Sequence, residues 1–555
     1  MSAKDAGRMH KVNKNKAAVC IIALSALICF LGASKKGTLE SLAVMSVNGK
    51  EVSVAEFDYY YYMTAQNLYS YLAQMGFPEL ESVDLYRPLS QQPIPESLIE
   101  QGVIPEDMAP EIGGRRMWAD HFSLSARENI EKIYILANEA EKAGMTLNQE
   151  NRQTLDSIVS DMKSSAQSNG ESAESLLHRF LGRGISERGY VEYLERQLVA
   201  EQFQGQTKEG YSYSDKELES RYEQNKDDFD YIDFYYHVIP GQLAIEEDPQ
   251  GDTGELQDSY RKEQKKKAEK MMGKITNAEE FPALVYEYEQ SEKSDEDSSG
   301  DPDDTVSETK QEALERLKGT TLNTDTVKGL REGLVQLPPE WEQLLSPERK
   351  KGDTFILENG PNFFVVLYDR RYRKEETPVD VRHILIGYDE GTDKPSKAEK
   401  KAARERADDI LNQWKNGAAT QESFAELAGT HSADQGSIST GGLYEGITST
   451  SSYVEPFLSW SLGSRKPGDT GIVETEYGFH IMYFVGSGKP VWKTEVSEAM
   501  ANEAWEKFLS DLMDKAEIDT YDRGMQRTKT PLPVPDPTPV PDDAMSGEHQ
   551  EIPPE

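Results

Sequence analysis

Residues 466–485 read KPGDTGIVETEYGFHIMYFV, and they join a Lys-x-Gly-Asp-Thr turn to an apolar segment rich in aromatic residues. Residues 350–369, KKGDTFILENGPNFFVVLYD, align with this stretch without a gap and repeat both features. A turn followed by such a run is typical of a β-strand. The repetition indicates one structural module that is used twice in the chain.

Upstream of these stretches, the two copies also correspond. YYHVIP around His237 resembles VRHILI around His383, and helical sequence rich in Lys, Glu and Ala follows both. The order strand, helix, helix, loop, strand predicts an α+β fold for each module. The first copy is longer, mainly because of the acidic stretch SEKSDEDSSGDPDD at 291–304. A solvated insertion fits this charge run better than a calcium loop, which would need a glutamate where Val306 stands.

A mostly helical domain is predicted for residues 40–230. VMSVNGKEVSVAEF, residues 44–57, predicts two short strands joined by an Asn48-Gly49 turn and then a helix that begins at Ser53. Tyrosines concentrate in that helix, where they indicate either a binding groove or ordinary core packing. From 118 to 226 the pattern is helical, with a capping box at Ser214 and breaks at Gly144, Gly170, Gly182 and Gly210.

The amino-terminal end differs in character from the rest of the chain. Residues 17–33, AAVCIIALSALICFLGA, are free of charge, and seven Lys and Arg against one Asp lie within residues 1–36. This run is close to the shortest that spans a hydrocarbon layer of ~30 Å. We expect a cytoplasmic basic segment at 1–16, a transmembrane signal anchor at 17–33 and the rest of the chain outside. A cleaved signal peptide and a buried helix are the alternatives.

Composition excludes several classes of protein. At 555 residues the chain is long enough for several domains, and its net charge of -38 disfavours nucleic acid as a partner. Both cysteines, Cys20 and Cys29, lie in the apolar run, so a disulfide or thiol nucleophile is excluded beyond it. The eight histidines show no metal-binding spacing. We therefore expect no metal and no cofactor.

Four segments of the second module carry a family resemblance. VRHILIGY, FAELAGTHSAD, GGLYEGI and the closing 466–484 stretch follow one another within about 108 residues. In this order they resemble the parvulin-type peptidyl-prolyl isomerase (PPIase) family, which implies a PPIase domain at 379–487. The flanking regions resemble extracytoplasmic foldases and chaperones of the PrsA and SurA kind. In these the helix after the isomerase module, here 491–518, completes the amino-terminal helical domain.

The resemblance implies a set of site residues. His383 and His480 match two histidines that face each other at the centre of the family's site, and Asp434 matches a position filled by Asp or Cys. These three are the expected catalytic residues. The resemblance further implies that the substrate-binding residues are Leu443, Tyr453, Phe457, Thr475 and Phe479.

The first module, residues 231–373, matches the same pattern only in part. His237 corresponds to His383, but Phe364 stands at the position of His480 and Asn359 at that of Thr475. Trp341 falls at the position of Phe457. We expect a degenerate parvulin-like module that keeps the fold and has lost the catalysis.

Together these features predict a peptidyl-prolyl cis-trans isomerase and foldase that assists secreted proteins. A non-catalytic holdase chaperone and an envelope scaffold are the alternatives. The expected partners are unfolded or proline-containing secreted polypeptides and, through the amino-terminal helix, the cell membrane, with a homodimer left open. The Pro-rich acidic segment 528–555 is expected to be an extended, disordered tail, either a spacer or a proline-motif ligand.

Overall fold

A computed structural model of the chain describes residues 39–242, 253–296, 308–334, 339–388, 395–529 and 531–532. The segments predicted at 1–16 and 17–33 lie outside the described residues, as do most of the tail at 528–555 and residues 297–304 of the acidic insertion. Among the helices that are described, none has both the length and the apolar character needed to cross a membrane. The chain divides into two compact units, residues 1–210 with 505–555 and residues 211–504.

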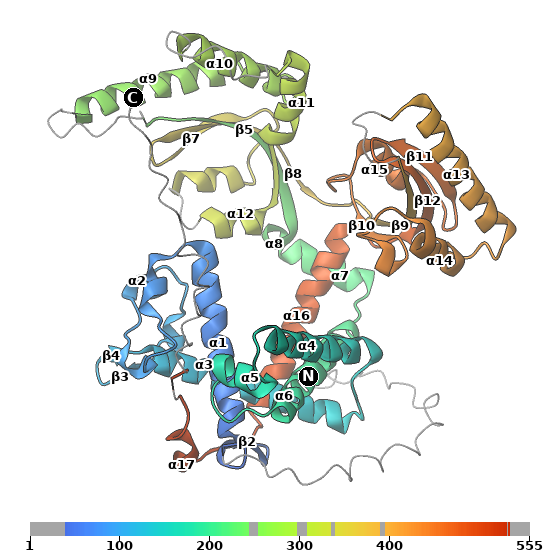
Figure 1. Cartoon of the computed structure of the whole chain (residues 1–555). Coiled ribbons are helices and arrows are strands. Elements are labelled where there is room, and N and C mark those ends of the chain that lie inside the picture. The colour runs from blue at the N-terminus through green and yellow to red at the C-terminus, as the bar shows by residue number, and fades with distance from the viewer. Residues whose placement is uncertain are drawn as a thin grey trace, which may run out of the picture. The chain divides into compact units, whose positions relative to one another are not determined.

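The first unit contains a small sheet made from both ends of the described chain (Figure 1). Strand β1 (Ala43–Val47) pairs antiparallel with β2 (Lys50–Ser53) on one side and with β13 (Ile518–Thr520) on the other. The β1–β2 turn has φ of 50° at Asn48 and 77° at Gly49, the left-handed pair that a type I′ turn requires. The predicted hairpin is thus confirmed, and β13 closes the sheet from the carboxyl-terminal side.

Long helices make up most of the first unit. Helix α1 (Val54–Met75) begins at Ser53, whose side chain accepts a hydrogen bond from the Glu56 amide at 3.1 Å. Each predicted glycine break follows the end of a helix. The helices concerned are α3 (Trp118–Lys142), α4 (Gln149–Ser168), α5 (Ala173–Leu181) and α6 (Glu187–Glu209). Residues 77–115 hold only short elements, among them α2 (Glu96–Glu100), β3 (Glu111–Ile112) and β4 (Arg115–Arg116), and α17 (Asp522–Met525) follows β13.

The tyrosines of α1 divide between core and surface. Tyr59, Tyr60, Tyr61 and Tyr62 are each at most 4% exposed and belong to the core of the first unit, whereas Tyr69 and Tyr71 are exposed. Core packing therefore accounts for the four consecutive tyrosines.

A buried carboxylate, Glu56, connects three helices of the first unit. It is 3% exposed, accepts a hydrogen bond from the Tyr134 hydroxyl of α3 at 2.7 Å and pairs with Arg196 of α6. The Arg196 guanidinium also lies over the Tyr134 ring, 4.3 Å from its centroid. A buried charge is tolerated when it is paired and hydrogen-bonded in this way.

The second unit begins with α7 (Asp215–Gln224) and α8 (Lys226–Phe229). The predicted capping box is confirmed at the start of α7, where Ser214 and Glu217 bond reciprocally. These helices share a small core with the first part of α16 (Val491–Met513), which includes Tyr222, Trp492 and Val496. The division between the units falls within α16, and Trp505 of its last part is 1% exposed.

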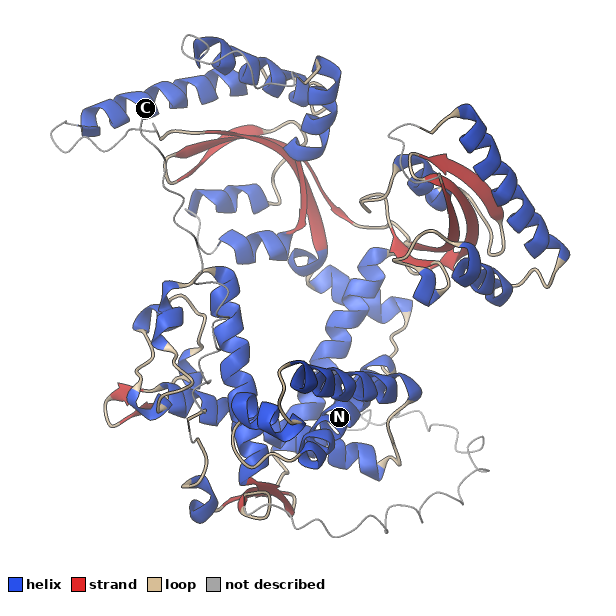
Figure 2. Ribbon diagram, viewed as in Figure 1, coloured by secondary structure: helices blue, strands red, loops and turns tan. Residues whose placement is uncertain are grey.

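Two four-stranded sheets follow within the second unit, and both have the same antiparallel topology (Figure 2). The first has the order β6-β5-β8-β7, and the second the order β10-β9-β12-β11. Their strands are β5 (Asp230–Ile239), β6 (Leu322–Thr326), β7 (Thr354–Asn359) and β8 (Asn362–Arg373), then β9 (Val379–Gly387), β10 (Leu443–Ile447), β11 (Thr470–Thr475) and β12 (Gly478–Ser487).

The register of the closing hairpins confirms the sequence repeat. Thr354 pairs with Leu367 in the first sheet, and Thr470 pairs with Tyr483 in the second. These are the positions that the gap-free alignment makes equivalent. The two modules are therefore copies of one fold at the level of residue pairing.

Helices cover both faces of each sheet. In the first module α9 (Thr253–Met272), α10 (Phe281–Glu296) and α11 (Lys310–Thr321) pack on one face, and α12 (Val327–Leu334) with the 3₁₀ helix Pro339–Leu345 packs on the other. In the second module α13 (Lys397–Asn416) and α14 (Gln421–His431) cover one face, and α15 (Glu455–Leu462) covers the other (Figure 1). The fold of 379–487 is thus α+β, as the sequence predicts.

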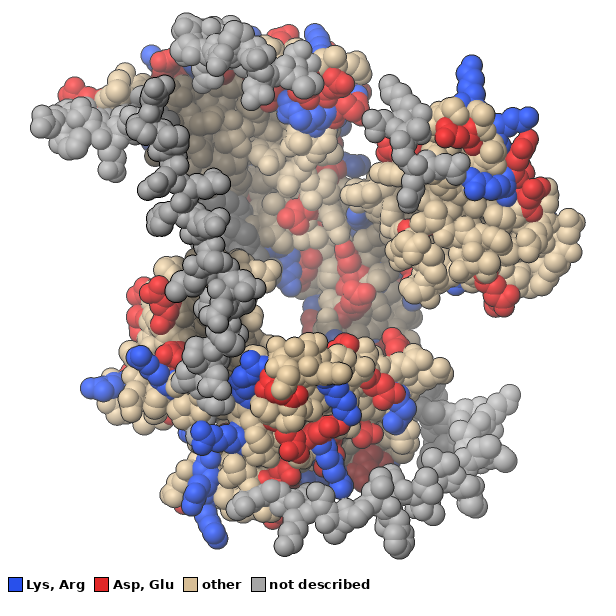
Figure 3. All heavy atoms as spheres, viewed as in Figure 1, with Lys and Arg blue, Asp and Glu red and all other residues tan. Residues whose placement is uncertain are grey.

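Acidic and basic side chains are interspersed over the visible surface of the first unit (Figure 3). Several of them pair, for example Arg188 with Glu192 at 2.8 Å, but both side chains are exposed. Exposed pairs of this kind contribute little to stability because water and salt screen them. Stability in this unit therefore depends on the buried core and on paired groups such as Glu56.

Replacing Glu56 by alanine is expected to lower the free energy of unfolding of the first unit by about 3 kcal/mol, because Arg196 and Tyr134 lose a buried partner. Urea denaturation of the full chain, followed by circular dichroism, measures this change. Glu51→Ala, at an exposed position on β2, is the matched control and should change stability by less than about 0.5 kcal/mol. Equal effects of the two substitutions would contradict the role given to Glu56.

Candidate active site

Two histidines lie side by side on one face of the second sheet. His383 of β9 pairs with Met482 of β12, and His480 of β12 pairs with Leu385 of β9, so both imidazoles project to the same side. The residues are 3% and 5% exposed. Their rings stack at 17° with centroids 5.1 Å apart, and their Nδ1 atoms are 2.9 Å apart. The two histidines predicted from the sequence therefore meet in one hydrogen bond.

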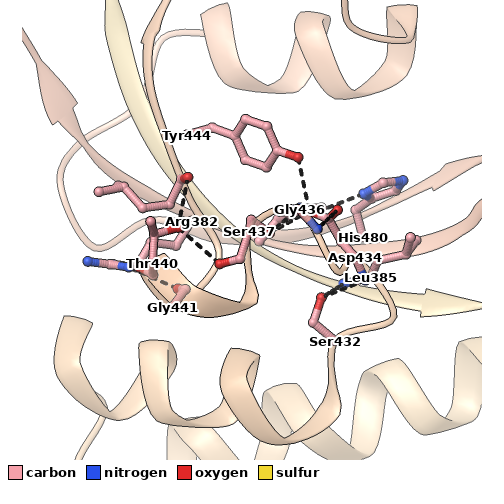
Figure 4. Close-up of polar contacts among 12 residues, drawn as sticks. Arg382, Leu385, Ser432, Asp434, Gly436, Ser437, Thr440, Gly441, Tyr444 and His480 are labelled. Atoms are coloured by element: carbon pink, nitrogen blue, oxygen red, sulfur yellow. Dashed lines mark hydrogen bonds and ion pairs between the residues drawn. The ribbon is translucent and has the colours of Figure 1, made fainter. Parts of the chain in front are cut away.

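A loop between α14 and β10 brings a carboxylate to this pair. Asp434 Oδ2 accepts a hydrogen bond from His383 Nε2 at 2.6 Å and from the Tyr444 hydroxyl at 2.9 Å. The Ser437 hydroxyl donates to the same oxygen, while Oδ1 accepts from the Gly436 amide at 3.2 Å. Figure 4 shows Tyr444, Ser437 and Asp434 converging beside His480. Asp434 thus receives three side-chain donors on one oxygen.

Thr475 forms the other end of the chain of hydrogen bonds. Its hydroxyl lies 2.8 Å from His480 Nε2, and it accepts a hydrogen bond from the Tyr477 amide at 3.2 Å. Thr475 is 8% exposed and belongs to β11, next to β12. Four predicted residues, Thr475, His480, His383 and Asp434, therefore form one continuous series.

The pKa values indicate one protonation state for this series. Burial lowers the pKa of His383, and burial together with the neighbouring His383 lowers the pKa of His480 to about 4. Burial alone would raise the pKa of Asp434, but hydrogen bonds from Ser437, His383 and Tyr444 outweigh it and hold the pKa below 3.8. Near neutral pH both imidazoles are neutral and the carboxylate is charged.

A charged carboxylate fixes the direction of every hydrogen bond. Because Asp434 can only accept, we assign the His383 proton to Nε2, which leaves Nδ1 of His383 as an acceptor. His480 then donates from Nδ1, and its Nε2 accepts from the Thr475 hydroxyl. The series therefore runs from Thr475 through His480 and His383 to Asp434.

Aromatic rings line the space beside the histidines. Phe457 of α15 is 3% exposed and lies edge-on to both imidazoles, with centroids 5.4 Å from His383 and 5.6 Å from His480. Tyr453 and Tyr444 pack against Phe457 at 5.4 and 5.9 Å, and against each other at 5.3 Å. An apolar, aromatic surface of this kind suits a proline ring.

Two of the predicted substrate-binding residues lie elsewhere. Leu443 pairs with Arg382 of β9 and therefore projects to the face opposite His383, and Tyr444, one residue later, takes the expected place in the aromatic set. Phe479 is adjacent to His480 in sequence and for the same reason faces the other way, where it joins the core under α13 and α14. The assignments of Leu443 and Phe479 to the pocket were wrong because neighbouring strand residues point to opposite faces.

Ser437 and Tyr444 were not predicted as part of the site. Ser437 is 2% exposed and follows Asp434 by three residues, a spacing that lets a loop side chain turn back to the carboxylate. Tyr444 could have been found by alternation, since Val381 of β9, its cross-strand partner, shares a face with His383.

The first module lacks this arrangement. Tyr236 pairs with Val366 in the way that His383 pairs with Met482, so Tyr236 and not His237 occupies the equivalent position. His237 projects to the other face, where its ring contacts Tyr288 of α10. Tyr236 stacks on Phe364 at 6.0 Å, and Trp341 lies edge-on to Phe364 at 4.9 Å. Three aromatic rings thus stand where the second module has two histidines and Phe457.

The segment before the first sheet's edge strand also differs between the modules. Helix α11 ends at Thr321 and β6 begins at Leu322, whereas residues 432–442 separate α14 from β10 in the second module. In the described residues, a helix and not a loop therefore leads directly into β6.

Within the described part of the chain, no group of three or more His, Cys, Asp or Glu residues is arranged to hold a metal ion.

Two pockets lie in the first unit. The larger of the two measures about 1010 Å³ and includes Glu40, Glu56, His178 and Arg196 in its lining. A second pocket of about 340 Å³ includes Tyr59, Tyr60, Met63 and Ile133. Neither contains a residue of the histidine site.

Known proteins match the second module and, in part, the flanking regions. Residues 367–485 match the PPIC-type PPIASE domain family. A parvulin-like PPIase from Rickettsia bellii (strain RML369-C) is 27% identical over 194 residues, which cover 32% of this chain and 61% of that protein. The chain thus spans about three fifths of that relative's length. The matched range begins within β8 of the first module and includes the whole histidine site of the second, so the second module is a parvulin-type domain by this match.

Solved structures with similarity to the chain include PrsA proteins and SurA-like chaperones. PrsA from Bacillus anthracis is 20% identical, with 25% of this chain and 58% of that chain covered and a TM-score of 0.17. PrsA from Bacillus subtilis is 16% identical, with 61% and 92% covered and a TM-score of 0.18. For the SurA-like chaperones PEB4 and Cj1289 of Campylobacter jejuni, the identity is 15%, the coverage 56% and 97%, and the TM-score 0.17.

The lowered pKa of His480, about 4, predicts that this imidazole stays neutral well below the usual range of histidine. Its side-chain NMR signals should hold constant chemical shifts between pH 8 and about pH 5.5, and the titration midpoint of His383 should lie below 6.5 because burial lowers its pKa. A histidine in a short peptide, which titrates near pH 6.5, is the reference. Titration of either site histidine near pH 6.5 would contradict the assigned state.

Proposed function

We propose that residues 379–487 catalyse cis-trans isomerisation of X-Pro peptide bonds. His383, Asp434 and His480 act as the catalytic residues, Thr475 supports the histidine pair, and Tyr453 and Phe457 receive the proline ring. The observation that carries this proposal is the directed series Thr475, His480, His383, Asp434 beside an aromatic surface. A parvulin-type domain at 367–485 supports it.

The reaction sets modest chemical demands. Rotation about an X-Pro bond faces a barrier of ~18–20 kcal/mol because amide resonance keeps the bond planar. In the planar form the carbonyl oxygen carries partial negative charge and the nitrogen partial positive charge, and both are lost in the twisted state. A nearby carboxylate disfavours negative charge on the oxygen, and an apolar pocket disfavours the charge-separated form. Asp434 and the aromatic rings therefore both favour the twisted state over the planar one.

The remaining parts of the chain give this activity a context. We propose that the protein is a foldase. Its helical domain, residues 40–230 completed by segment 491–518 with helix α16, holds unfolded or proline-containing client polypeptides. The first module, 231–373, acts as a binding surface or spacer, since its described residues include no counterpart of the carboxylate loop or of the histidine pair. The envelope scaffold and the homodimer are secondary proposals.

Location is part of the proposal. The uncharged run at 17–33 with its basic flanks favours a single-pass anchor in the cell membrane, with the bulk of the chain extracytoplasmic and facing secreted clients. Carbonate extraction of membranes from cells that express the full chain, beside a variant without residues 17–33, tests the anchor. Loss of the variant from the membrane fraction is expected, and equal fractionation of both would contradict the proposal.

The isomerase proposal is tested on the full chain with an Ala-Pro peptide in a protease-free fluorescence assay. Asp434→Asn keeps the size of the side chain but removes its charge, and it should lower kcat/KM on the order of 10-fold or more. Asp469→Asn, at the turn before β11, is a matched control and should leave kcat/KM unchanged. Unchanged activity of Asp434→Asn would sink the catalytic assignment.

A double variant, His383→Ala with His480→Ala, tests two points: whether the second module alone catalyses isomerisation, and whether client holding is independent of that catalysis. If the first module contributes no catalysis, this variant falls to the uncatalysed rate. Suppression of the aggregation of an unfolded client should survive in it, because holding is assigned to the helical domain. A wild-type chain that suppresses aggregation and yet has no isomerase activity would establish the holdase alternative instead.

A further inference from the structure

Tyr444 takes part in both halves of the site. Its ring lies edge-on to His383 with centroids 5.1 Å apart, and it contacts Tyr453 and Phe457 in the aromatic set. Its hydroxyl donates to Asp434 Oδ2 at 2.9 Å. Among the three described rings of that set, Tyr444 is the one whose hydroxyl also donates to Asp434.

The hydroxyl helps to hold the carboxylate in place. Asp434 lies on a loop and keeps 19% of its side-chain surface exposed, so the backbone alone does not fix its orientation. His383, Ser437 and Tyr444 approach the same oxygen from a strand, from the loop itself and from a second strand. Hydrogen bonds to a charged group are about twice as strong as neutral ones. The Tyr444 bond attaches the carboxylate on the loop to β10.

The ring and the hydroxyl are connected rigidly. Two side-chain torsions set the position of a tyrosine ring. Because the Tyr444 ring packs against Phe457 and Tyr453, the position of its hydroxyl oxygen is restricted as well. A proline ring that presses on Tyr444 therefore also constrains the donor to Asp434.

We propose that Tyr444 is a positioning residue that couples the aromatic pocket to the hydrogen-bonded series, its ring forming a wall of the pocket while its hydroxyl holds the Asp434 carboxylate against His383. This inference rests on the proposed isomerase function for its kinetic consequence, but the hydrogen bond can be tested without it.

Few charged or titratable side chains lie close to Asp434. In the described residues they are His383 on β9, His480 on β12 and Tyr444 on β10, with Ser437 as an uncharged donor. Burial and the bond to Asp434 raise the pKa of Tyr444 to about 12, so the phenol stays protonated and remains a donor at neutral pH. Removal of this donor should therefore raise the pKa of Asp434.

The experiment compares the full-length wild type with Tyr444→Phe, which keeps the ring and removes the hydroxyl. The titration midpoint of Asp434, followed through the His383 imidazole signals by NMR, should rise by about one pH unit. With an Ala-Pro peptide, KM should stay within about 2-fold while kcat falls about 5- to 10-fold, because the ring still contacts proline. Tyr444→Leu removes both parts and should raise KM as well.

Tyr86→Phe is the control, since this tyrosine is 40% exposed and belongs to the first unit, and it should change neither the midpoint nor the kinetics. A wild-type midpoint in Tyr444→Phe would overturn the inference. Should that variant not fold, Tyr444→Leu supplies the same titration. If the wild type has no isomerase activity, the proposed function fails, and the NMR midpoint still decides whether Tyr444 holds the carboxylate.

Discussion

The register between β9 and β12 is the constraint on which the site depends. It places His383 and His480 on one face and leaves Ile384, Ile386, Phe479 and Ile481 to the core on the other. If one strand slipped by one residue, its side chains would move to the opposite faces, and one imidazole would lie under α13 and α14, away from its partner. The same apolar pattern that fixes the fold therefore fixes the position of the two histidines.

Much of this could be predicted from the sequence. The Asn48-Gly49 turn, the glycine breaks between helices and the gap-free repeat depend on local chemistry, and the structure contains all of them. His383, Asp434 and His480 also come together as expected. Leu443, Phe479 and His237 were misplaced by a single residue or face, because a motif gives the order of residues in a strand but not which face each one takes. Tyr444 was missed for the same reason.

Comparison of the two modules shows which parts of the fold persist where the histidine site is absent. Both keep the strand order and the hairpin register, and both keep apolar cores on the two faces of the sheet. In the described residues of the first module, helix α11 leads directly into β6, and aromatic rings stand in place of the histidines. In the second module the 432–442 loop bonds to β9, through the Ala433 amide to Leu385 and the His383 amide to Gly442, each at 2.8 Å, and the first sheet keeps its strand order without these bonds. The sheet and its covering helices therefore form in the first module without counterparts of His383, His480 and Asp434 among the described residues.

The direction of the hydrogen-bonded series limits what the site can do. Each proton from Thr475 to Asp434 is directed to a neighbour, and one oxygen of the terminal carboxylate accepts three side-chain donors. Such an arrangement holds its groups in one pattern of donors and acceptors. The site is therefore a fixed electrostatic surface, and a molecule that enters it meets charges and dipoles that are already in place.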